Sequence, residues 1–444
     1  MGGGGEVRRS DRAAHHHFLD LANGHRRVQA LGADLHAVLD AVTAGDHALL
    51  VAPTGGGKTL AGFLPTLMDL AVAPREGLHT LYISPLKALA VDIARNLMAP
   101  IEGMALPIRV ETRTGDTPAN RRARQRAAPP HILLTTPESL ALLLSQPEAR
   151  EFFVGLGGII IDEIHALAGT KRGDQLALCL SRLAVLAPDA KRIGLSATVA
   201  APDALRAWLA PDARADSVRL ITAEAGAAPV FDLQLPEGHL PWGGHMGLAS
   251  MPEVYRRIEA ARVTIVFVNT RAQAELCFAA LWRLNEAALP IALHHGSLEI
   301  DQRRKVEAAM AAGKLRAVVA TASLDLGIDW GDVDQVIQIG APKGVARLLQ
   351  RVGRANHRMD EPSHAVLVPA NRFEVIECVA AIEAVAAGEL DGDPPRPGGL
   401  DVLAQHVLAM ACHAPFHPDE LYAEVIRAAP YAALTRKDFD DVVR

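Results

Sequence analysis

A glycine-rich segment, residues 52–59 (APTGGGKT), carries residue types that bind phosphate groups, and it joins a short apolar run to a helix-prone run at 60–64. In a strand–loop–helix arrangement, backbone N–H groups and the helix N-terminus surround phosphate oxygens. Lys58 is expected to reach the outer phosphates, and the Thr59 hydroxyl to bind Mg²⁺. The other nucleotide-binding residues are expected in the loop itself: Thr54, Gly55, Gly56 and Gly57. Ala52 stands where the strict pattern has Gly, so an ordinary glycine-rich turn is the alternative.

An acidic pair, Asp162 and Glu163, follows the apolar run 159–161. A strand of this type delivers the acids to the carboxyl edge of a sheet, where ligands of open α/β sheets bind. In a P-loop ATPase the first acid holds Mg²⁺ and the second polarises the attacking water. We therefore expect Asp162 to bind Mg²⁺ and Glu163 to act as the catalytic base, with a surface acid pair as the alternative. The segment Ser196-Ala197-Thr198 ends another strand pattern, and its hydroxyl groups could hydrogen-bond the acid-bearing strand.

Four arginines recur near helical spacing later in the chain: Arg347, Arg351, Arg354 and Arg358. Residues three or four apart lie on one face of a helix, so several of these side chains can point the same way. One of them could reach a bound nucleotide from across an interdomain cleft, as an arginine finger does. A solvated basic helix is the alternative.

The segments that must position these residues alternate between short apolar runs and helical patterns. In residues 24–214 the apolar runs are HALLVA, LHTLYIS, HILLTT, GGIIIDE and RIGLSAT. This alternation predicts a parallel sheet with helices on both faces. A second series in residues 253–387 (VTIVFVN, PIALHHG, LRAVVAT, DQVIQIG and HAVLVP) predicts another α/β domain without a phosphate loop of its own. Repeated Pro and Gly predict a connector at 215–252.

The two ends of the chain differ from these domains. Residues 1–23 have no apolar period and are expected to be flexible. Residues 388–400 are rich in Pro and Gly and predict a linker. Residues 401–444 have helical patterns, and the chain stops at Arg444, too soon for this third unit to close a core by itself.

Composition limits the class of protein. The 444 residues are 50% hydrophobic and 22% charged, no apolar run is long enough to cross a bilayer, and the first residues lack the apolar core of a signal peptide. We therefore expect a cytoplasmic protein. The formal net charge of −6 still allows a local basic channel for nucleic acid. With only 4% aromatic residues, strand binding should use phosphate contacts more than base stacking. The four cysteines are far apart and predict reduced, buried side chains.

Several short motifs resemble those of superfamily 2 helicases, and they occur in the same order. They are APTGGGKT, SPLKALA (84–90), TTPESL (135–140), DEIH (162–165), SAT (196–198), VFVNTR (266–271), HHGS (294–297), ATASLDLGID (320–329) and QRVGRANHR (350–358). The last motif resembles the Lhr (large helicase-related) family. The runs GLHTLYISPLKALAVDIARNL, IALHHGSLE and LDLGIDWGDVD are similar to its ligase-associated DExH-box branch.

The resemblance implies two tandem RecA-like domains followed by the start of a winged-helix domain, with ATP and Mg²⁺ as cofactors. It also implies a monomeric 3′-to-5′ helicase or translocase that acts in DNA repair on single-stranded DNA tails and on DNA or RNA:DNA duplexes. A DNA ligase and a nuclease are the protein partners that it suggests. Two rival hypotheses are a nucleic-acid-stimulated ATPase without unwinding, and a catalytically impaired scaffold for a ligase or nuclease.

Matched motif by motif, the resemblance implies that Arg354 is the arginine finger, Gln350 lies near the γ-phosphate and Asp329 contacts the ribose. Strand contacts are implied at residues that follow strand patterns: Ser84, Pro85, Lys87, Gly115, Asp116, Thr136, Pro137 and Glu138 in the first domain, and Thr270, Arg271, His295, Gly296 and Thr321 in the second. Many relatives carry an adenine-reading Gln where this chain has Leu35, and Gln29 is the nearest glutamine.

Overall fold

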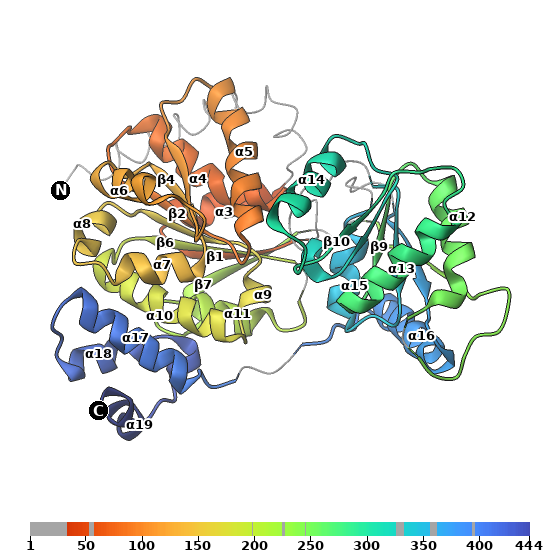
Figure 1. Cartoon of the computed structure of the whole chain (residues 1–444). Coiled ribbons are helices and arrows are strands. Elements are labelled where there is room, and N and C mark those ends of the chain that lie inside the picture. The colour runs from red at the N-terminus through yellow and green to blue at the C-terminus, as the bar shows by residue number, and fades with distance from the viewer. Residues whose placement is uncertain are drawn as a thin grey trace.

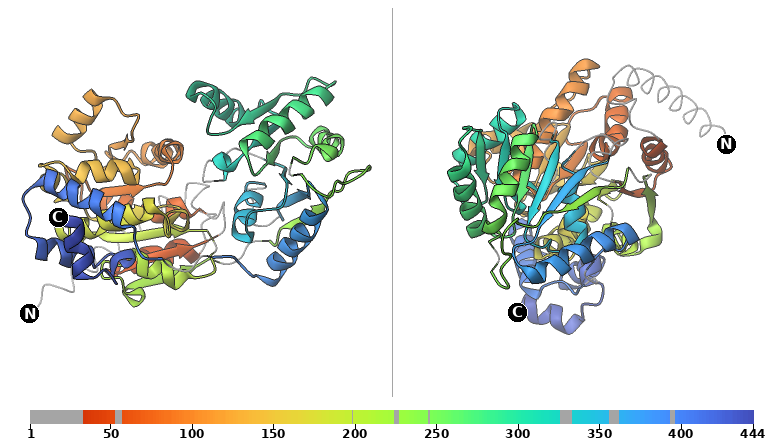
Figure 2. Two further views of the ribbon diagram at one scale, coloured as in Figure 1. Left: turned by 60° about the horizontal axis from the view of Figure 1, so that its bottom comes forward. Right: turned by 90° about the vertical axis from the view of Figure 1, so that its right-hand side faces the viewer.

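The chain folds into two α/β domains, each built on one parallel sheet (Figures 1 and 2). The computed structural model describes residues 33–52, 57–197, 199–223, 227–244, 246–325, 333–355, 362–392 and 396–444. The predicted architecture of two parallel-sheet domains is confirmed.

The first sheet has the strand order β3-β4-β2-β5-β6-β1-β7, and every pairing is parallel. Its strands are β1 (His47–Val51), β2 (Thr80–Ile83), β3 (Val110–Arg113), β4 (Ile132–Thr135), β5 (Gly158–Ile161), β6 (Lys191–Ser196) and β7 (Val218–Thr222). Alternate strand residues enter two separate cores: Ile159 and Ile161 pack on one face, and Ile160 packs on the other. Burial on both faces explains why these strands are continuous apolar runs.

Helices cover both faces of this sheet. One core is shared with α3 (Ala33–Thr43), α4 (Lys58–Val72) and α5 (Lys87–Gly103). The other is shared with α7 (Pro137–Leu144), α8 (Ala149–Phe153), α9 (Ile164–Leu167), α10 (Lys171–Leu186) and α11 (Pro202–Leu209). The basic helix α6 (Ala119–Ala127) follows β3 and buries only Gln125.

The second sheet has the strand order β10-β11-β9-β12-β13-β8, again parallel throughout. Its strands are β8 (Val230–Leu233), β9 (Thr264–Phe267), β10 (Ile291–His294), β11 (Ala317–Ala320), β12 (Gln335–Ile339) and β13 (His364–Val368). Its helices are α12 (Met251–Ala260), α13 (Arg271–Leu284), α14 (Ile300–Ala311), α15 (Val345–Val352) and α16 (Arg372–Ala387).

The stretch 215–252, expected as a connector, contributes a strand to each sheet. β7 pairs with β1 at one edge of the first sheet, and β8 pairs with β13 at one edge of the second. An edge strand needs less apolar surface than a central one, and β8 alternates between exposed and half-buried residues. This weak apolar pattern between Pro and Gly residues explains why the sequence indicates only a connector.

Three C-terminal helices pack on the first domain: α17 (Leu400–His413), α18 (Pro418–Val425) and α19 (Arg436–Val443) (Figure 1). Their buried side chains, such as Leu403, Val425 and Phe439, belong to the core that α7 and α10 share with the sheet. Because this short unit shares a core with the first domain, it needs none of its own. Arg182 also donates to Glu424 at 3.1 Å, an ion pair that fastens α18 to α10.

Three further expectations concern membrane spans, metal sites and cysteines in the described segments. Within them, no helix is both long and apolar enough to cross a membrane, and no three His, Cys, Asp or Glu side chains are grouped so that they could hold a metal ion. Cys179, Cys277 and Cys378 are buried as predicted. The prediction is wrong for Cys412, which lies on the exposed side of α17.

His406 of α17 makes the stability of the C-terminal unit dependent on pH. Its ring is 6% exposed, and burial, helped by the charge of Arg182, lowers its pKa to about 4. Since the unfolded chain binds the proton below about pH 6.5, the free energy of unfolding falls as the pH drops from there towards 4. We expect the wild type to lose about 2 kcal/mol more than His406→Leu between pH 7.5 and 5. Urea unfolding at both pH values measures this difference, and equal losses would contradict it.

Candidate nucleotide and nucleic-acid sites

The strand order divides one edge of the first sheet into two adjacent regions. The residues expected to bind nucleotide follow β1 and β5, which β6 separates. The residues expected to bind a strand follow β2, β4 and β3, on the other side of β5. Because all strands are parallel, every one of these carboxyl ends lies at the same edge, where open α/β sheets bind ligands.

Lys58 begins α4 directly after the glycine-rich loop. Its side chain is 9% exposed, and its Nζ donates to the Ala52 carbonyl at 2.7 Å. Gly57 precedes it with φ 69°, in the left-handed region that glycine adopts without strain. Burial lowers the pKa of Lys58, while the charges of Glu163 and Asp162 raise it. Thr59 is half-buried on the same turn, and the predicted loop residues Thr54, Gly55 and Gly56 lie outside the described residues.

Asp162 follows β5 and is 4% exposed. Its Oδ2 accepts a hydrogen bond from the Tyr82 hydroxyl at 2.5 Å, and its Oδ1 accepts one from the Glu163 N–H at 2.8 Å. Burial, with the neighbouring Glu163 charge, raises the pKa of Asp162 to about 6, while Tyr82 and Lys58 oppose the rise. Tyr82 is a site residue that sequence reasoning missed. The available signal was a tyrosine hydroxyl in the strand beside the acid-bearing one.

Glu163 occupies a strained position. It has φ 48°, a left-handed conformation that is uncommon for a residue other than glycine, and the residue is 8% exposed. Its Oε2 lies 3.5 Å from His165 Nε2. His165 Nδ1 lies 3.1 Å from the Ser196 hydroxyl, so the Ser-Ala-Thr segment contacts the helix α9 that follows the acid-bearing strand. Burial lowers the pKa of His165, so its ring is neutral at pH 7.

The second domain reaches this cluster through α15 and the turn after it. The Gln350 amide nitrogen lies 2.8 Å from His165 Nε2. Arg354 is 3% exposed and donates to the Asp325 carbonyl at 3.1 Å. Its charge also lowers the pKa of Lys58, so the two cations are within electrostatic range. The structure therefore brings Gln350 and Arg354 to the side of the first domain that holds Lys58 and the acids; Asp329 lies outside the described residues.

The arginines that share a helical period have different environments. Arg351 is 2% exposed, and its guanidinium donates to Asp325 Oδ1 at 2.8 Å and to Gln338 Oε1 at 2.5 Å. It also lies over the Phe267 ring, 4.8 Å from the centroid. Arg347 is about half exposed and lies 3.7 Å from Asp325. Arg351 is thus a structural residue of the second domain, and Arg358 lies outside the described residues.

The residues expected to bind a strand in the first domain form two linked pairs at the surface. Lys87 Nζ donates to Asp116 Oδ1 at 2.8 Å, beside exposed Gly115. Arg172, which sequence reasoning missed, donates to Glu138 Oε1 at 2.5 Å and to the Pro85 carbonyl at 2.8 Å. Four of the predicted residues are buried: Ser84, Pro85, Thr136 and Pro137. The Ser84 hydroxyl closes a local turn with Leu86.

The second-domain residues of this group follow β9, β10 and β11, which are neighbours in the sheet. Arg271 and Gly296 are exposed, and Thr321 is half-buried. Thr270 is exposed too, and its hydroxyl caps α13. The His295 ring is 2% exposed and lies 3.4 Å from Glu275, so its side chain does not reach the surface. The whole residue is 2% exposed, so the structure does not place His295 where a strand could contact it.

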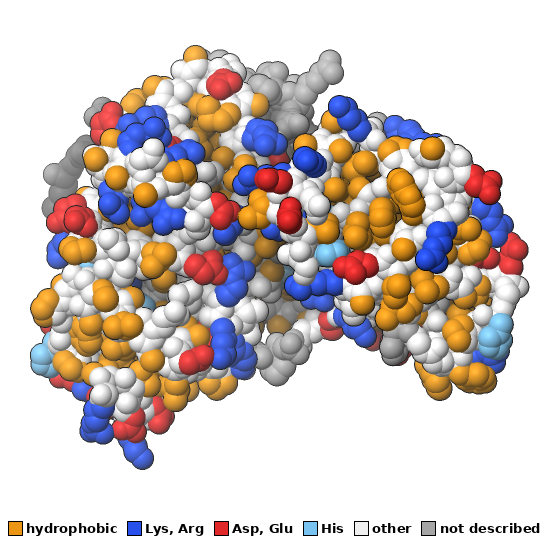
Figure 3. Space-filling view, viewed as in Figure 1, with side chains coloured by type: hydrophobic (Ala, Val, Ile, Leu, Met, Phe, Trp, Pro, Cys, Tyr) orange, Lys and Arg blue, Asp and Glu red, His pale blue; other side chains and the backbone are white. Residues whose placement is uncertain are grey.

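Cationic side chains from both domains meet around Asp116. Its hydrogen bond with Lys87 holds the pKa of Asp116 below its usual range, and Arg304 and Arg303 of α14 act in the same direction from the second domain. Figure 3 shows Lys and Arg side chains on both sides of the hollow between the two domains. This is the local basic surface that an acidic chain needs if it binds nucleic acid.

The residues present fit Mg²⁺. This ion prefers oxygen ligands, and Asp162 and Thr59 supply a carboxylate and a hydroxyl near Lys58. Tyr82 and the Glu163 N–H bind different oxygens of Asp162. A carboxylate oxygen has room for a second contact, so both can still face a cation or its bound water.

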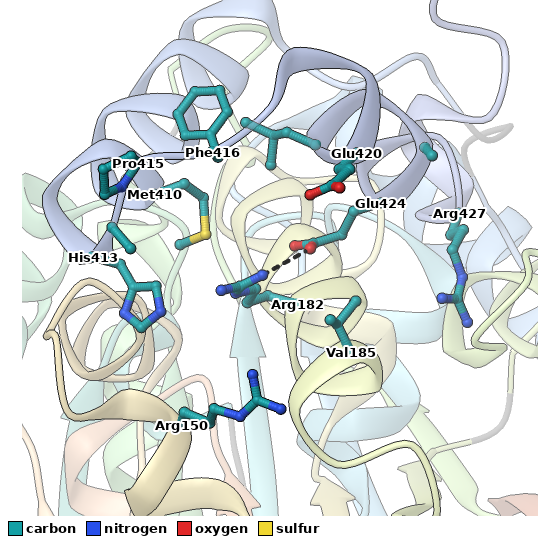
Figure 4. A pocket seen from close by; sticks show the side chains of 13 residues that line it. Arg150, Arg182, Val185, Met410, His413, Pro415, Phe416, Glu420, Glu424 and Arg427 are labelled. Carbon is teal, nitrogen blue, oxygen red and sulfur yellow. Dashed lines mark hydrogen bonds and ion pairs between the residues drawn. The ribbon is translucent and has the colours of Figure 1, made fainter.

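A pocket of about 630 Å³ lies away from this edge, where α8 and α10 meet the C-terminal helices (Figure 4). Arg182 and Glu424 form their ion pair within it, and Met410 and Phe416 supply apolar walls. None of the predicted site residues lines it. It belongs to the joint between the C-terminal unit and the first domain.

Models of three protein families match successive parts of the chain. They are described as DEAD/DEAH box helicase (residues 35–206), helicase conserved C-terminal domain (249–359) and large helicase-related protein, winged helix domain (383–444). The third match identifies the C-terminal helices as part of a winged-helix domain, as the sequence predicts.

Curated relatives include the "Lhr helicase/ probable uracil glycosylase" of Mycolicibacterium smegmatis, 41% identical over 90% of this chain and 30% of the relative. The "Lhr helicase/uracil glycosylase" of Escherichia coli is 39% identical over 89% of this chain and 30% of its own length. The "ATP-dependent helicase Lhr-Core protein 2" of Thermococcus barophilus is 38% identical over 92% of this chain and 50% of its own length. The chain thus spans half or less of the length of these relatives.

Solved structures agree with these matches. The Mycobacterium smegmatis helicase Lhr bound to ssDNA and AMP-PNP superposes with a TM-score of 0.83 at 40% identity, covering 92% of this chain and 55% of that one. The DUF1998 helicase MrfA bound to DNA superposes with a TM-score of 0.75 at 25% identity, covering 89% of this chain and 58% of that one. With its two parallel-sheet domains, its winged-helix segment and these relatives, the chain belongs to the Lhr (large helicase-related) family of superfamily 2.

Proposed function

We propose that this chain hydrolyses ATP to move 3′ to 5′ along single-stranded DNA and to unwind DNA or RNA:DNA duplexes during DNA repair. The observation that carries the proposal is the contact between Gln350 and His165, 2.8 Å apart. It joins a helix of the second domain to the acid-bearing loop of the first. A motor needs such a connection, because hydrolysis in one place must alter the relation between two domains that hold a strand.

Each nucleotide-site residue has a distinct task in this proposal. Lys58 binds the outer phosphates, and Thr59 and Asp162 hold Mg²⁺, which neutralises charge on the phosphates when it is bound. Glu163 accepts the proton of the attacking water, and its exposure of only 8% keeps bulk water from competing. Arg354 approaches from the second domain and stabilises the charge that develops on the transferred phosphoryl group.

His165 couples the catalytic base to both domains. Its ring contacts Ser196 through Nδ1 and lies near both Glu163 and Gln350 through Nε2. A neutral ring presents one N–H and one lone pair. A movement of Gln350 therefore changes whether His165 Nε2 contacts Gln350 or Glu163. That change alters the orientation of the Glu163 side chain. Domain closure and hydrolysis become linked through this one side chain.

The proposed strand path crosses the carboxyl ends of β2, β3 and β4 in the first domain and of β9, β10 and β11 in the second. Its exposed groups are backbone, hydroxyl and charged atoms, which contact phosphates and sugars without reading bases. Lys87 is paired with Asp116, so a DNA phosphate would compete with that carboxylate for the ammonium group. Such contacts suit a motor that must move along any sequence.

The comparisons support this proposal. A relative 40% identical to the chain is a helicase seen with ssDNA and AMP-PNP, and two curated relatives are named ATP-dependent helicases. The resemblance to the ligase-associated branch supports, as part of the same proposal, a DNA ligase or nuclease partner and a monomer that acts in the cytoplasm.

A strand-displacement assay tests the proposal. We expect an RNA:DNA hybrid with a 3′ single-stranded DNA tail to be unwound in the presence of ATP and Mg²⁺, and a hybrid with a 5′ tail to be unwound at least ten times more slowly. Equal rates from both tails would contradict the polarity. ATP hydrolysis without displacement of either substrate would instead identify a nucleic-acid-stimulated ATPase.

A further inference from the structure

Tyr82 is a fully buried side chain that touches both halves of the proposed nucleotide site. It lies in the middle of β2, opposite Ile160 of β5, two residues before Asp162. Its hydroxyl donates to Asp162 Oδ2 at 2.5 Å. Its ring stacks on Phe63 of α4, with ring centroids 5.3 Å apart and planes at 22°. One side chain thus joins the helix that begins at Lys58 to the carboxylate expected to bind Mg²⁺.

The two hydrogen bonds to Asp162 fix its carboxylate plane. The Glu163 N–H holds Oδ1 from the backbone, and Tyr82 holds Oδ2 from the neighbouring strand. With only the backbone bond, the carboxylate could rotate about its Cβ–Cγ bond, since that torsion is broad and intrinsically soft. A rotated carboxylate would turn its free acceptor positions away from Thr59 and the phosphates.

The stack on Phe63 adds a second constraint. Stacked aromatic pairs are attracted beyond the effect of their buried area, so the tyrosine ring and α4 hold their relative position. Because α4 also carries Lys58 and Thr59, the distance between the two oxygen donors for Mg²⁺ depends on this stack. The contact acts on geometry and does not touch the nucleotide.

We propose that Tyr82 is the positioning residue of the Mg²⁺ site: it orients the Asp162 carboxylate and sets its distance from the α4 ligand Thr59. The inference rests on the proposed function, because it assumes that the site binds a magnesium nucleotide. Groups that hydrogen-bond metal ligands typically change metal affinity about 10- to 100-fold when removed. Tyr82 should therefore govern the Mg²⁺ requirement and leave metal-free nucleotide binding unchanged.

Tyr82→Phe tests this, because it deletes one hydroxyl and keeps the stacked ring. The matched control is Tyr431→Phe, which deletes the hydroxyl of another buried tyrosine that donates to the Gly399 carbonyl at 2.9 Å in the C-terminal unit. The measurement is equilibrium binding of a fluorescent AMP-PNP, first in EDTA and then during titration with Mg²⁺. Phe63→Leu, which keeps the hydroxyl but removes the stack, tests the same link from the helix side.

We expect Tyr82→Phe to need about 10- to 100-fold more Mg²⁺ for half-maximal tightening, with unchanged binding in EDTA, while Tyr431→Phe behaves as the wild type. Phe63→Leu should shift the Mg²⁺ requirement in the same direction by a smaller factor. The inference is overturned if Tyr82→Phe and Phe63→Leu both show the wild-type Mg²⁺ requirement, or if they weaken binding in EDTA by the same factor as in Mg²⁺. A wild type that binds the analogue without any response to Mg²⁺ would overturn the proposed function itself.

Discussion

Arg354→Ala is expected to lower DNA-stimulated ATP turnover by about 10³- to 10⁵-fold, the range found for arginine fingers. Arg354 enters from the second domain, is 3% exposed and acts on the electrostatics of Lys58. Its contribution arises as charge develops on the phosphoryl group, so ATP affinity should change only a few-fold. Steady-state hydrolysis, together with equilibrium binding of AMP-PNP, separates the two effects.

Arg347→Ala is the matched control for this experiment. It removes an arginine from the same helical series, but one that is about half exposed and lies beside Asp325. Its turnover should stay within about twofold of the wild type, as expected for an exposed ion pair. If Arg354→Ala hydrolysed ATP as fast as Arg347→Ala, Arg354 would not be the finger.

Arg351→Met is expected to destabilise the second domain by about 3–5 kcal/mol, the cost of breaking a buried ion pair from one side. The substitution would leave Asp325, 4% exposed, without its principal cation, and would remove the partner of buried Gln338. Hydrogen–deuterium exchange of the β12 amides (335–339) and thermal unfolding both measure this loss of stability. The β12 amides should exchange much faster in the variant.

Two further variants separate loss of the pair from loss of volume. Arg347→Met removes the exposed arginine that faces the same carboxylate, and it should cost less than about 1 kcal/mol. Replacing both members of the pair, as in Arg351→Met with Asp325→Leu, should recover part of the lost stability, because no uncompensated charge remains buried. If Arg351→Met showed the same hydrogen–deuterium exchange and the same thermal unfolding as the wild type, the structural role of this arginine would be contradicted.

Local patterns in the sequence were sufficient to predict much of the fold. The continuous apolar runs that became β1, β2, β4, β5 and β6 require burial on both faces, and the structure places them inside one parallel sheet. Acidic and glycine-rich segments at strand ends could be assigned to one edge, because parallel strands share it. On this basis the sequence predicts that Lys58, Asp162 and Glu163 lie near one another, and in the structure the two acids are within electrostatic range of Lys58.

Other features depend on contacts between distant segments, and sequence spacing does not encode them. Arg347, Arg351 and Arg354 recur at helical spacing, yet their tertiary surroundings differ: Arg347 is about half exposed, and Arg351 and Arg354 are buried among different partners. His295 resembles a strand-contacting residue in its motif, but Glu275 and the protein interior hold its ring. Tyr82 and Arg172 act through partners on other elements, so their roles become clear from the contacts in the folded chain.

The most direct test of the proposed motor is ATP hydrolysis by the wild type and by Glu163→Gln, each with and without single-stranded DNA. The substitution keeps the size of the side chain but removes the carboxylate that would accept the proton. Strong stimulation of the wild type by DNA is expected, with a loss of about 10²- to 10⁴-fold in Glu163→Gln, the usual contribution of a general base. Hydrolysis at equal rates in both proteins, or by neither, would contradict a motor driven from this site.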